Sequence, residues 1–190
     1  MKTEWTDAVD RSLPLPEYPR PQLARVGWLN LNGPWDYAFT RSEHEPEAYH
    51  GEILVPFSPE TELSGVQRSL RRGEYLWYRR RVLLPKEFAG KHLLLHFGAV
   101  DQIATVWVNG VKTASHIGGY LPFEADVTNA VSGGELTITV RVTDDTDGSW
   151  HTRGKQRPRR GGIWYTPQSG IWQPVWAERR SEEHTSELQS

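Results

Sequence analysis

The chain has 190 residues, of which 37% are hydrophobic and 24% are charged, and its formal net charge is −2. It contains no cysteine, which excludes a disulfide framework, a thiol nucleophile and any metal site built on cysteine. The length fits one domain with tails and falls short of the roughly 250 residues of a (β/α)8 barrel. The net charge argues against nucleic acid as the partner of the chain.

The first residues of the chain predict neither export nor insertion into a membrane. The N-terminal sequence lacks the apolar stretch of a signal peptide, and no run approaches the roughly 18 apolar residues of a membrane-spanning helix. We therefore expect a cytoplasmic protein with no membrane partner.

Residues 1–26 contain closely spaced prolines, and these predict an extended N-terminal arm because proline and the residue before it avoid helical conformations.

Residues 27–179 show short apolar runs separated by glycine and proline, a pattern typical of strands and turns. No segment shows a helical periodicity over three turns. The pattern predicts an all-β domain, a two-sheet sandwich of the jelly-roll type. The expected strands cover residues 35–40, 52–55, 75–84, 92–97, 103–108, 111–116, 136–142 and 171–178.

One hairpin is predicted by its turn residues. Asn109-Gly110 separates two of the expected strands, and this dipeptide favours a type I′ turn because both of its residues tolerate a positive φ. The alternation of side chains along the preceding strand then places Ala104, Val106 and Val108 on one face.

Three consecutive arginines occupy positions 79–81 within another expected strand. Neighbouring side chains in a strand point to opposite faces, so at least one of these arginines needs a charged partner or an interface. The candidate partners are Asp101, Glu124 and Asp126.

Two segments depart from the strand pattern. Residues 144–162 form a long polar loop with acidic residues at its start and basic residues after them, and long loops of this kind are often functional. Residues 180–190 follow a strong final strand and are almost entirely polar, which predicts a disordered or foreign tail.

Five segments, taken together, carry a resemblance to a known family. They are residues 31–35 (LNGPW), 77–80 (WYRR), 96–110, 118–128 and 169–176. In this order and spacing they resemble the N-terminal sugar-binding domain of glycoside hydrolase family 2, which includes β-galactosidases, β-glucuronidases and β-mannosidases. The resemblance implies a jelly-roll sandwich like the galactose-binding domains.

The resemblance also implies what this chain lacks. In the family an immunoglobulin-like domain and a catalytic barrel follow this domain, and the barrel carries the acid/base in an Asn-Glu dipeptide and a separate glutamate nucleophile. This sequence contains no Asn-Glu dipeptide. We therefore expect a chain cut before the barrel, with no catalytic residue and no activity alone. The implied partners are a β-glycoside carbohydrate and the downstream domains of the same enzyme.

The long loop contains the candidate site. Asp147-Gly148-Ser149-Trp150 resembles an Asp-Gly-Ser-Tyr segment of family β-galactosidases, whose aspartate helps to hold the galactosyl group and a sodium ion. The resemblance implies that Asp147 binds substrate, and Arg153, Lys155 and Gln156, in a segment that recurs in some family members, are candidate hydrogen-bond donors to the sugar. Trp150 is a candidate for stacking on a sugar because of its aromatic ring. The basic residues that follow depart from those galactosidases, so galactose is not assigned. The resemblance places a sodium or magnesium ion only in the full enzyme, and implies no cofactor or metal in this chain.

Each candidate also has a plain structural interpretation. Asp144, Asp145 and Asp147 suit a solvated turn, and the basic residues suit an exposed loop. Trp150, Trp164 and Tyr165 suit either sugar stacking or a domain interface. At the level of function, the alternative to a glycosidase domain is a free-standing carbohydrate-binding module without hydrolytic activity, and a third interpretation is a scaffold that does not touch sugar.

Overall fold

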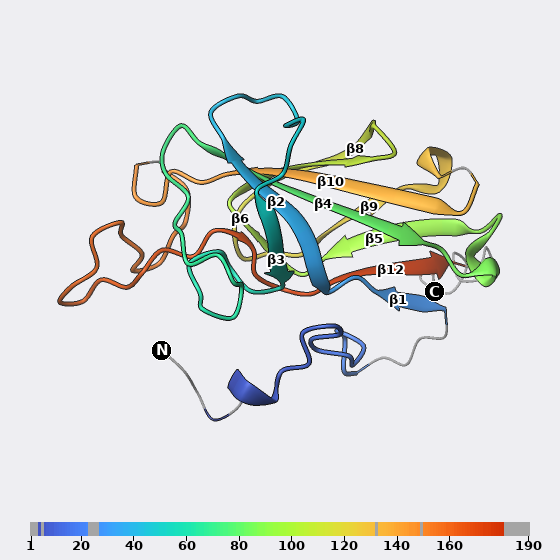
Figure 1. Cartoon of the computed structure of the whole chain (residues 1–190), viewed down its shortest axis with the longest axis horizontal. Helices are drawn as coiled ribbons and strands as arrows, with labels where there is room; N and C mark the ends of the chain where they lie inside the picture. The colour runs from blue at the N-terminus through green and yellow to red at the C-terminus, as the bar shows by residue number, and fades with distance from the viewer. Residues whose placement is uncertain (1–3, 5, 23–26, 132, 149, 181–190) are drawn as a thin grey trace, which may run out of the picture.

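A computed structural model describes residues 4, 6–22, 27–131, 133–148 and 150–180. Over these residues the chain forms a β-sandwich in which two antiparallel sheets face each other (Figure 1). The helices within the described residues are three short 3-10 turns, η1 (Thr6–Ala8), η2 (Lys86–Phe88) and η3 (Thr128–Ala130). None of the described helices is long and apolar enough to cross a membrane.

The larger sheet has six antiparallel strands in the order β3-β2-β4-β10-β7-β8. At its centre β10 pairs with β4 on one side and with β7 on the other, so Val140 lies opposite both Tyr78 and Val106. The strands of this sheet are β2 (Gly33–Thr40), β3 (Gly51–Val55), β4 (Tyr75–Leu83), β7 (Ile103–Val108), β8 (Val111–Ile117) and β10 (Glu135–Thr143).

The smaller sheet has four antiparallel strands in the order β1-β12-β5-β9. A separate pair, β6 with β11, places Gly170 opposite Asp101 at one end of the sandwich. The strands of these two sheets are β1 (Trp28–Asn30), β5 (His92–Phe97), β6 (Val100–Asp101), β9 (Phe123–Asp126), β11 (Gly170–Ile171) and β12 (Val175–Arg180).

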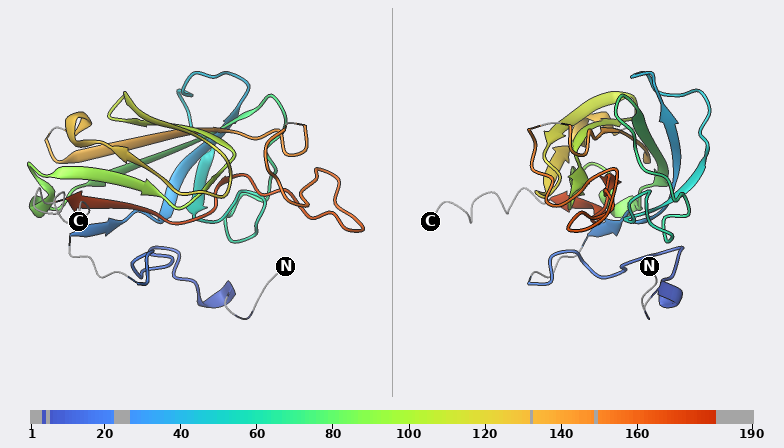
Figure 2. Two further views of the ribbon diagram at one scale, coloured as in Figure 1. Left: turned by 180° about the vertical axis from the view of Figure 1, so that it is seen from behind. Right: turned by 90° about the vertical axis from the view of Figure 1, so that its left-hand side faces the viewer.

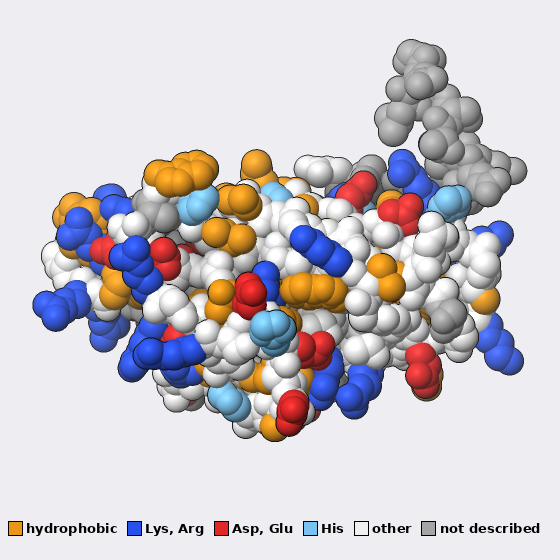
Figure 3. All heavy atoms as spheres, turned by 90° about the horizontal axis from the view of Figure 1, so that it is seen from above, with side chains coloured by type: hydrophobic (Ala, Val, Ile, Leu, Met, Phe, Trp, Pro, Cys, Tyr) orange, Lys and Arg blue, Asp and Glu red, His pale blue; other side chains and the backbone are white. Residues whose placement is uncertain are grey.

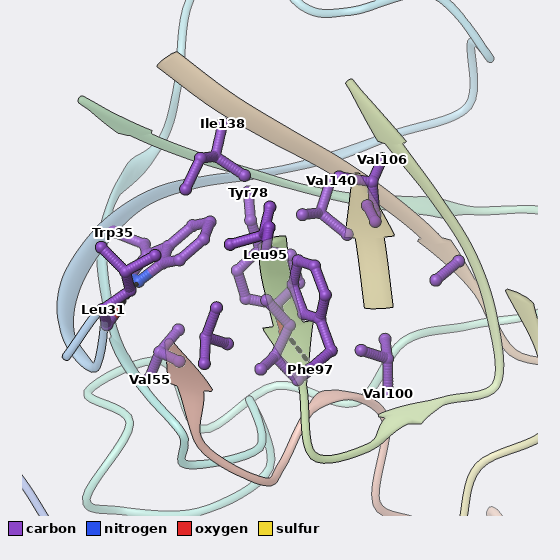
Figure 4. Packing of buried hydrophobic residues seen from close by; sticks show 14 of the residues in the cluster. Leu31, Trp35, Val55, Tyr78, Leu95, Phe97, Val100, Val106, Ile138 and Val140 are labelled. Atoms are coloured by element: carbon purple, nitrogen blue, oxygen red, sulfur yellow. Dashed lines mark hydrogen bonds between the residues drawn. The ribbon is translucent and has the colours of Figure 1, made fainter. Parts of the chain in front are cut away.

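The core lies between the inner faces of the two sheets (Figure 4). Alternate residues of the central strands point into it, as the two-residue period of a strand requires. Trp35 and Tyr78 from the larger sheet meet edge to face, with ring centroids 6.4 Å apart, and both are almost completely buried, as is Phe97 from the smaller sheet. The indole nitrogen of Trp35 donates a hydrogen bond of 2.9 Å to the Leu31 carbonyl, so this ring is buried without an unsatisfied donor.

The prediction of an all-β sandwich is confirmed, and each of the eight expected strands corresponds to at least one observed strand. The expected strand 171–178 is divided into β11 and β12, and Pro174, which has no N–H for a sheet hydrogen bond, lies in the break. The short strands β1, β6 and β9 were not predicted, because two to four residues are too few to show a period. The jelly-roll connectivity stays a prediction.

The predicted Asn-Gly hairpin is confirmed. Asn109 and Gly110 have φ values of 49° and 80°, and the turn joins β7 to β8 with Val108 opposite Val111. The inner face of β7 consists, as expected, of residues that are fully buried: Ala104, Val106 and Val108.

Asn109 also links this turn to the neighbouring strand, and replacing it should cost stability. Its Nδ2 donates to the carbonyls of Ala130 (3.0 Å) and Glu135 (3.1 Å), and its Oδ1 accepts from the Thr137 N–H (2.8 Å). We expect Asn109→Ala to lower the free energy of unfolding by about 1–2 kcal/mol in urea titrations. Asn109→Gly removes the same hydrogen bonds but tolerates the positive φ, so it should lower the free energy of unfolding by less than Asn109→Ala does. An Asn109→Ala variant as stable as the parent would contradict this prediction.

The N-terminal arm lies along the smaller sheet (Figure 2). Tyr18 meets Trp28 edge to face at 5.2 Å and donates a hydrogen bond to Glu178 of β12, and Asn30 donates to the Leu15 carbonyl at 2.8 Å. Apart from η1, the described residues of this arm form no helix or strand. The predicted tail lies outside the described residues, except for Arg180, which is the last residue of β12.

The arginine run finds other partners than those expected. Arg79 pairs with Asp36 on the adjacent strand β2, with 3.0 Å between Nη2 and Oδ2. Arg80 points to the other side of β4 and donates to the backbone carbonyl of Asn32 at 3.0 Å. The candidate partners were wrong because the neighbours of β4 are β2 and β10, whereas Asp101 lies in β6 and Glu124 and Asp126 lie in β9. The sequence does not reveal which strands become neighbours.

Candidate functional site

The long loop leaves one end of the sandwich and returns to it. The predicted loop, residues 144–162, is the larger part of a connection that begins after Thr143, the last residue of β10, and reaches Gly170, the first residue of β11 (Figure 1, orange to red). The 56–64 segment, which follows β3, and the β6 strand lie beside its base, as the hydrogen bonds between them show. The loop therefore has a base inside the fold and a tip that projects from it.

A chain of side-chain hydrogen bonds holds the base of the loop. Gln156 donates from Nε2 to Asp101 Oδ2 at 3.2 Å, and its Oε1 accepts from the Gln168 N–H at 2.6 Å. Gln168 in turn accepts a hydrogen bond from the Ser58 hydroxyl. The amide nitrogen and the amide oxygen of Gln156 are thus both hydrogen-bonded within the protein.

A second contact fastens the return of the loop. Glu60 accepts from both the hydroxyl and the N–H of Ser169, at 2.6 Å and 3.2 Å. Gly170, which follows Ser169, has a φ of 73° and packs directly against the Tyr78 hydroxyl. The backbone is therefore held in place where it enters β11, by Glu60 at Ser169 and by Tyr78 at Gly170.

Three carboxyl groups at this base are held in a poorly solvated environment. Burial raises the pKa of Asp101 to about 7, and the neighbouring charge of Asp144 adds to this effect. Burial raises the pKa of Glu60 to about 7 in spite of its bonds to Ser169, and it raises that of Asp144 to about 6. These groups bind protons more tightly in the folded state than in the unfolded state.

The structure brings two of the predicted site residues together. The Arg153 guanidinium donates to the Asp147 backbone carbonyl at 2.9 Å. The Asp147 carboxylate itself lies 3.9 Å from Arg157 Nε, in an ion pair that is partly exposed. Arg157 also stacks over the Trp164 ring at 3.8 Å. Asp147 is therefore accessible and already faces a cation.

The other predicted residues lie apart from this pair. Trp150 is 88% exposed and Lys155 is exposed on the tip. Gln156 is directed into the base toward Asp101, which makes it a positioning residue within this chain. Of the other aromatic candidates, Tyr165 is 67% exposed, whereas Arg157 covers one face of Trp164.

Sequence reasoning missed the residues that fasten the loop. Glu60, Ser58 and Gln168 stand in segments without a motif, and Asp101 was considered only as a partner for an arginine. The single available signal was that Asp101 and Gln168 fall in or beside segments that carry the family resemblance. Polar residues next to buried strands at the same end of a sandwich are candidates for such a network.

A metal ion is not supported by the residues around Asp147. Among the described residues no group of three His, Asp or Glu side chains is arranged to hold one, and the charged neighbour of the Asp147 carboxylate is Arg157.

Comparison with known proteins identifies the family. The model of the glycosyl hydrolases family 2 sugar-binding domain matches residues 68–175. The β-glucuronidase of Paenibacillus borealis is 44% identical over an alignment of 135 positions that covers 67% of this chain and 22% of that protein. The β-galactosidase of Thermoanaerobacter pseudethanolicus is 30% identical over 113 residues, covering 59% of this chain and 14% of that protein. The chain thus spans about a fifth or less of these relatives.

Solved structures show the same fold. A β-glucuronidase from Ruminococcus gnavus in complex with C6-substituted uronic isofagomine superposes with a TM-score of 0.66 at 22% identity, over 87% of this chain and 31% of that one. The β-glucuronidase of Faecalibacterium prausnitzii gives a TM-score of 0.59 at 27% identity, over 87% of this chain and 33% of that one. With a family match that covers more than half of its residues and a sandwich of the same architecture, the chain belongs to glycosyl hydrolase family 2, as its sugar-binding domain.

Proposed function

We propose that this domain serves a β-glycosidase in carbohydrate metabolism, and that its 144–162 loop borders the substrate pocket formed with the other domains of the enzyme. The observation that carries the proposal is the division of the loop into an anchored base and an exposed tip. The base is hydrogen-bonded to Asp101, whereas the tip presents Trp150 and the accessible Asp147.

The physical role of Asp147 in this proposal is to accept hydrogen bonds from sugar hydroxyls. A carboxylate is an acceptor with two oxygens, and its bonds to hydroxyl groups are charge-assisted and therefore strong. Arg153 holds the backbone at Asp147, and Arg157 faces its carboxylate, so its position is restricted before a sugar arrives. Restricting it beforehand lowers the entropy cost of binding.

We expect the 190-residue chain on its own to hydrolyse no glycoside. The resemblance assigns both catalytic glutamates to a barrel, and the acid/base to an Asn-Glu dipeptide that this sequence does not contain. Catalysis in retaining glycosidases needs two carboxyl groups roughly 5–5.5 Å apart across the scissile bond.

The test is Asp147→Ala in the full-length enzyme, assayed with p-nitrophenyl β-glycosides. We expect kcat/KM to fall by about tenfold or more, because a hydrogen bond to a charged group contributes about 1.5–3 kcal/mol. Glu135→Gln, an exposed carboxylate at the start of β10 and at the other end of that strand from the loop, is the matched control and should leave kcat/KM unchanged. If the Asp147→Ala enzyme keeps both the thermal stability and the kcat/KM of the parent, the loop does not bind substrate and has a structural role only.

A further inference from the structure

A groove opens at the end of the sandwich opposite to the long loop, where the turns η2 and η3 lie (Figure 1). One wall belongs to the connection from β4 to β5, residues 84–91, and the other contains Thr128, Val131, Gly133 and Gly134 between β9 and β10. Its volume is about 540 Å³, which lies within the range of sites for small molecules. We call it the end groove.

The floor of the end groove is part of the hydrophobic core. Phe88 from η2 and Leu93 from β5 are almost completely buried within the core cluster. Leu84 and Val131, on the two walls, are partly buried and pack against the same cluster. The core therefore reaches the surface here, and an apolar ligand in the groove would extend its packing.

The two walls of the end groove are fastened to each other. The Leu84 N–H donates a hydrogen bond of 2.8 Å to the Gly134 carbonyl, and the Leu93 N–H donates one of 3.0 Å to the Thr128 hydroxyl. The mouth is unobstructed, since a Cβ at Gly133 would meet no atom within 4 Å. The groove is thus formed before a ligand arrives, which lowers the entropy cost of binding.

Two exposed cations, Lys86 and Lys91, stand among the residues that line the end groove. Within the described part of the chain, neither ammonium group takes part in an ion pair. The acidic residues nearest to the walls in sequence, Glu87 and Glu135, do not line the groove. Basic side chains project from this end of the molecule (Figure 3, right). The rim therefore favours a negatively charged ligand.

From these features we propose that the end groove binds a single-chain fatty acid in its carboxylate form. The alkyl tail packs on Phe88 and Leu93, and the carboxylate pairs with Lys86 and Lys91. The apolar lining is mostly aliphatic, which suits an alkyl chain, and each methylene that it buries contributes a similar favourable free energy. The inference goes beyond the proposed function, because β10 separates this groove from the long loop and binding here requires no other domain.

The experiment is an NMR titration of the isotope-labelled 190-residue chain at neutral pH, with each ligand below its micelle concentration. Three ligands share one tail and differ in the head: octanoate, octan-1-ol and octylammonium. We expect octanoate to bind about threefold or more tightly than octan-1-ol, and octylammonium to bind more weakly than both, because exposed ion pairs contribute modestly. Decanoate should bind about tenfold more tightly than octanoate, since two more methylenes are buried.

Variants locate the site. Lys86→Gln with Lys91→Gln should weaken octanoate about threefold or more and leave octan-1-ol unchanged. Arg159→Gln with Arg160→Gln, which removes two exposed cations from the long loop, is the matched control and should change neither. Val131→Phe places a larger side chain in the groove and should weaken both ligands by about tenfold. Thermal unfolding of each variant checks its fold, and the lysine variant carries the test if Val131→Phe is unstable.

Each of the opposite outcomes overturns the inference. If octan-1-ol or octylammonium binds as tightly as octanoate, the lysines do not receive a carboxylate, and if decanoate binds no more tightly than octanoate, the tail is not buried. Weaker binding of octanoate by the Arg159/Arg160 variant would place the ligand elsewhere, and no binding at all would remove the site. Sedimentation with phosphatidylglycerol vesicles that is lost in the Lys86/Lys91 variant would indicate a membrane surface instead. None of these results affects the Asp147 kinetics, so the two proposals fail separately.

Discussion

Gly170→Ala should destabilise the domain by about 3 kcal/mol or more, because the glycine is needed for two reasons at once. Its φ of 73° is unfavourable for a residue with a side chain. A Cβ at this position would also lie 2.0 Å from the Tyr78 hydroxyl oxygen and 3.1 Å from a methyl group of Leu76. Tyr78 is fully buried and accepts a hydrogen bond from the Ile171 N–H at 3.2 Å, so it has no room to move away.

Two comparisons separate the two causes. Gly73 has a nearly identical φ of 75° with no atom within 4 Å of a Cβ, so Gly73→Ala should cost only about 1 kcal/mol in urea unfolding. In a Tyr78→Phe background, which lacks the clashing oxygen, Gly170→Ala should cost clearly less than in the parent. Equal costs for the two glycine variants, or equal costs in the two backgrounds, would show that the contact with Tyr78 is unimportant.

Asp101→Asn should raise the free energy of unfolding of the domain at pH 8. The difference in this free energy between the variant and the parent should be about 2 kcal/mol more favourable at pH 8 than at pH 4. Burial and the charge of Asp144 raise the pKa of Asp101 to about 7 from an ordinary value of 3.8. The folded state therefore binds this proton more tightly, and the stability that it contributes is lost as the pH rises from about 4 to about 7. Asparagine is neutral at every pH, keeps an oxygen for Gln156, and avoids that loss.

The comparison is made between variants because other groups act in the opposite direction. Burial lowers the pKa of His96. Burial alone would raise the pKa of Glu178, but hydrogen bonds from Tyr18 and Trp176 hold it below its ordinary value. The stability that these two groups contribute is lost as the pH falls. The pH dependence of the parent's unfolding free energy therefore combines this loss with the opposite contribution of Asp101.

Asp126 provides a control of opposite sign. Hydrogen bonds from the Thr128 hydroxyl and N–H lower its pKa, so Asp126→Asn should destabilise the domain at neutral pH and have less effect in acid. Urea titrations from pH 4 to pH 8 measure both variants. An Asp101→Asn variant whose stability relative to the parent does not rise with pH would contradict the burial of an ionisable group at the base of the loop.

Much of the local structure was predictable because it depends on neighbouring residues. Strands appear as alternating apolar runs, and the Asn109-Gly110 turn follows from the φ values that these residues tolerate. Short elements were not predictable, since β6 and β11 have two residues each and exist only because they pair with one another. Of the candidate site, the sequence indicated the loop through its length and polar composition and Asp147 through a resemblance, but it did not indicate which side chains anchor the loop.

The sequence by itself determined the strand segments, the turn at Asn109 and the family of this domain, since each depends on local order and spacing. Only the tertiary structure decided the partners. Arg79 meets Asp36 from 43 positions away, and Gln156 meets Asp101 from 55 positions away. These contacts depend on which strands become neighbours and on how a long loop closes, and those outcomes minimise the free energy of the whole chain rather than of any one segment.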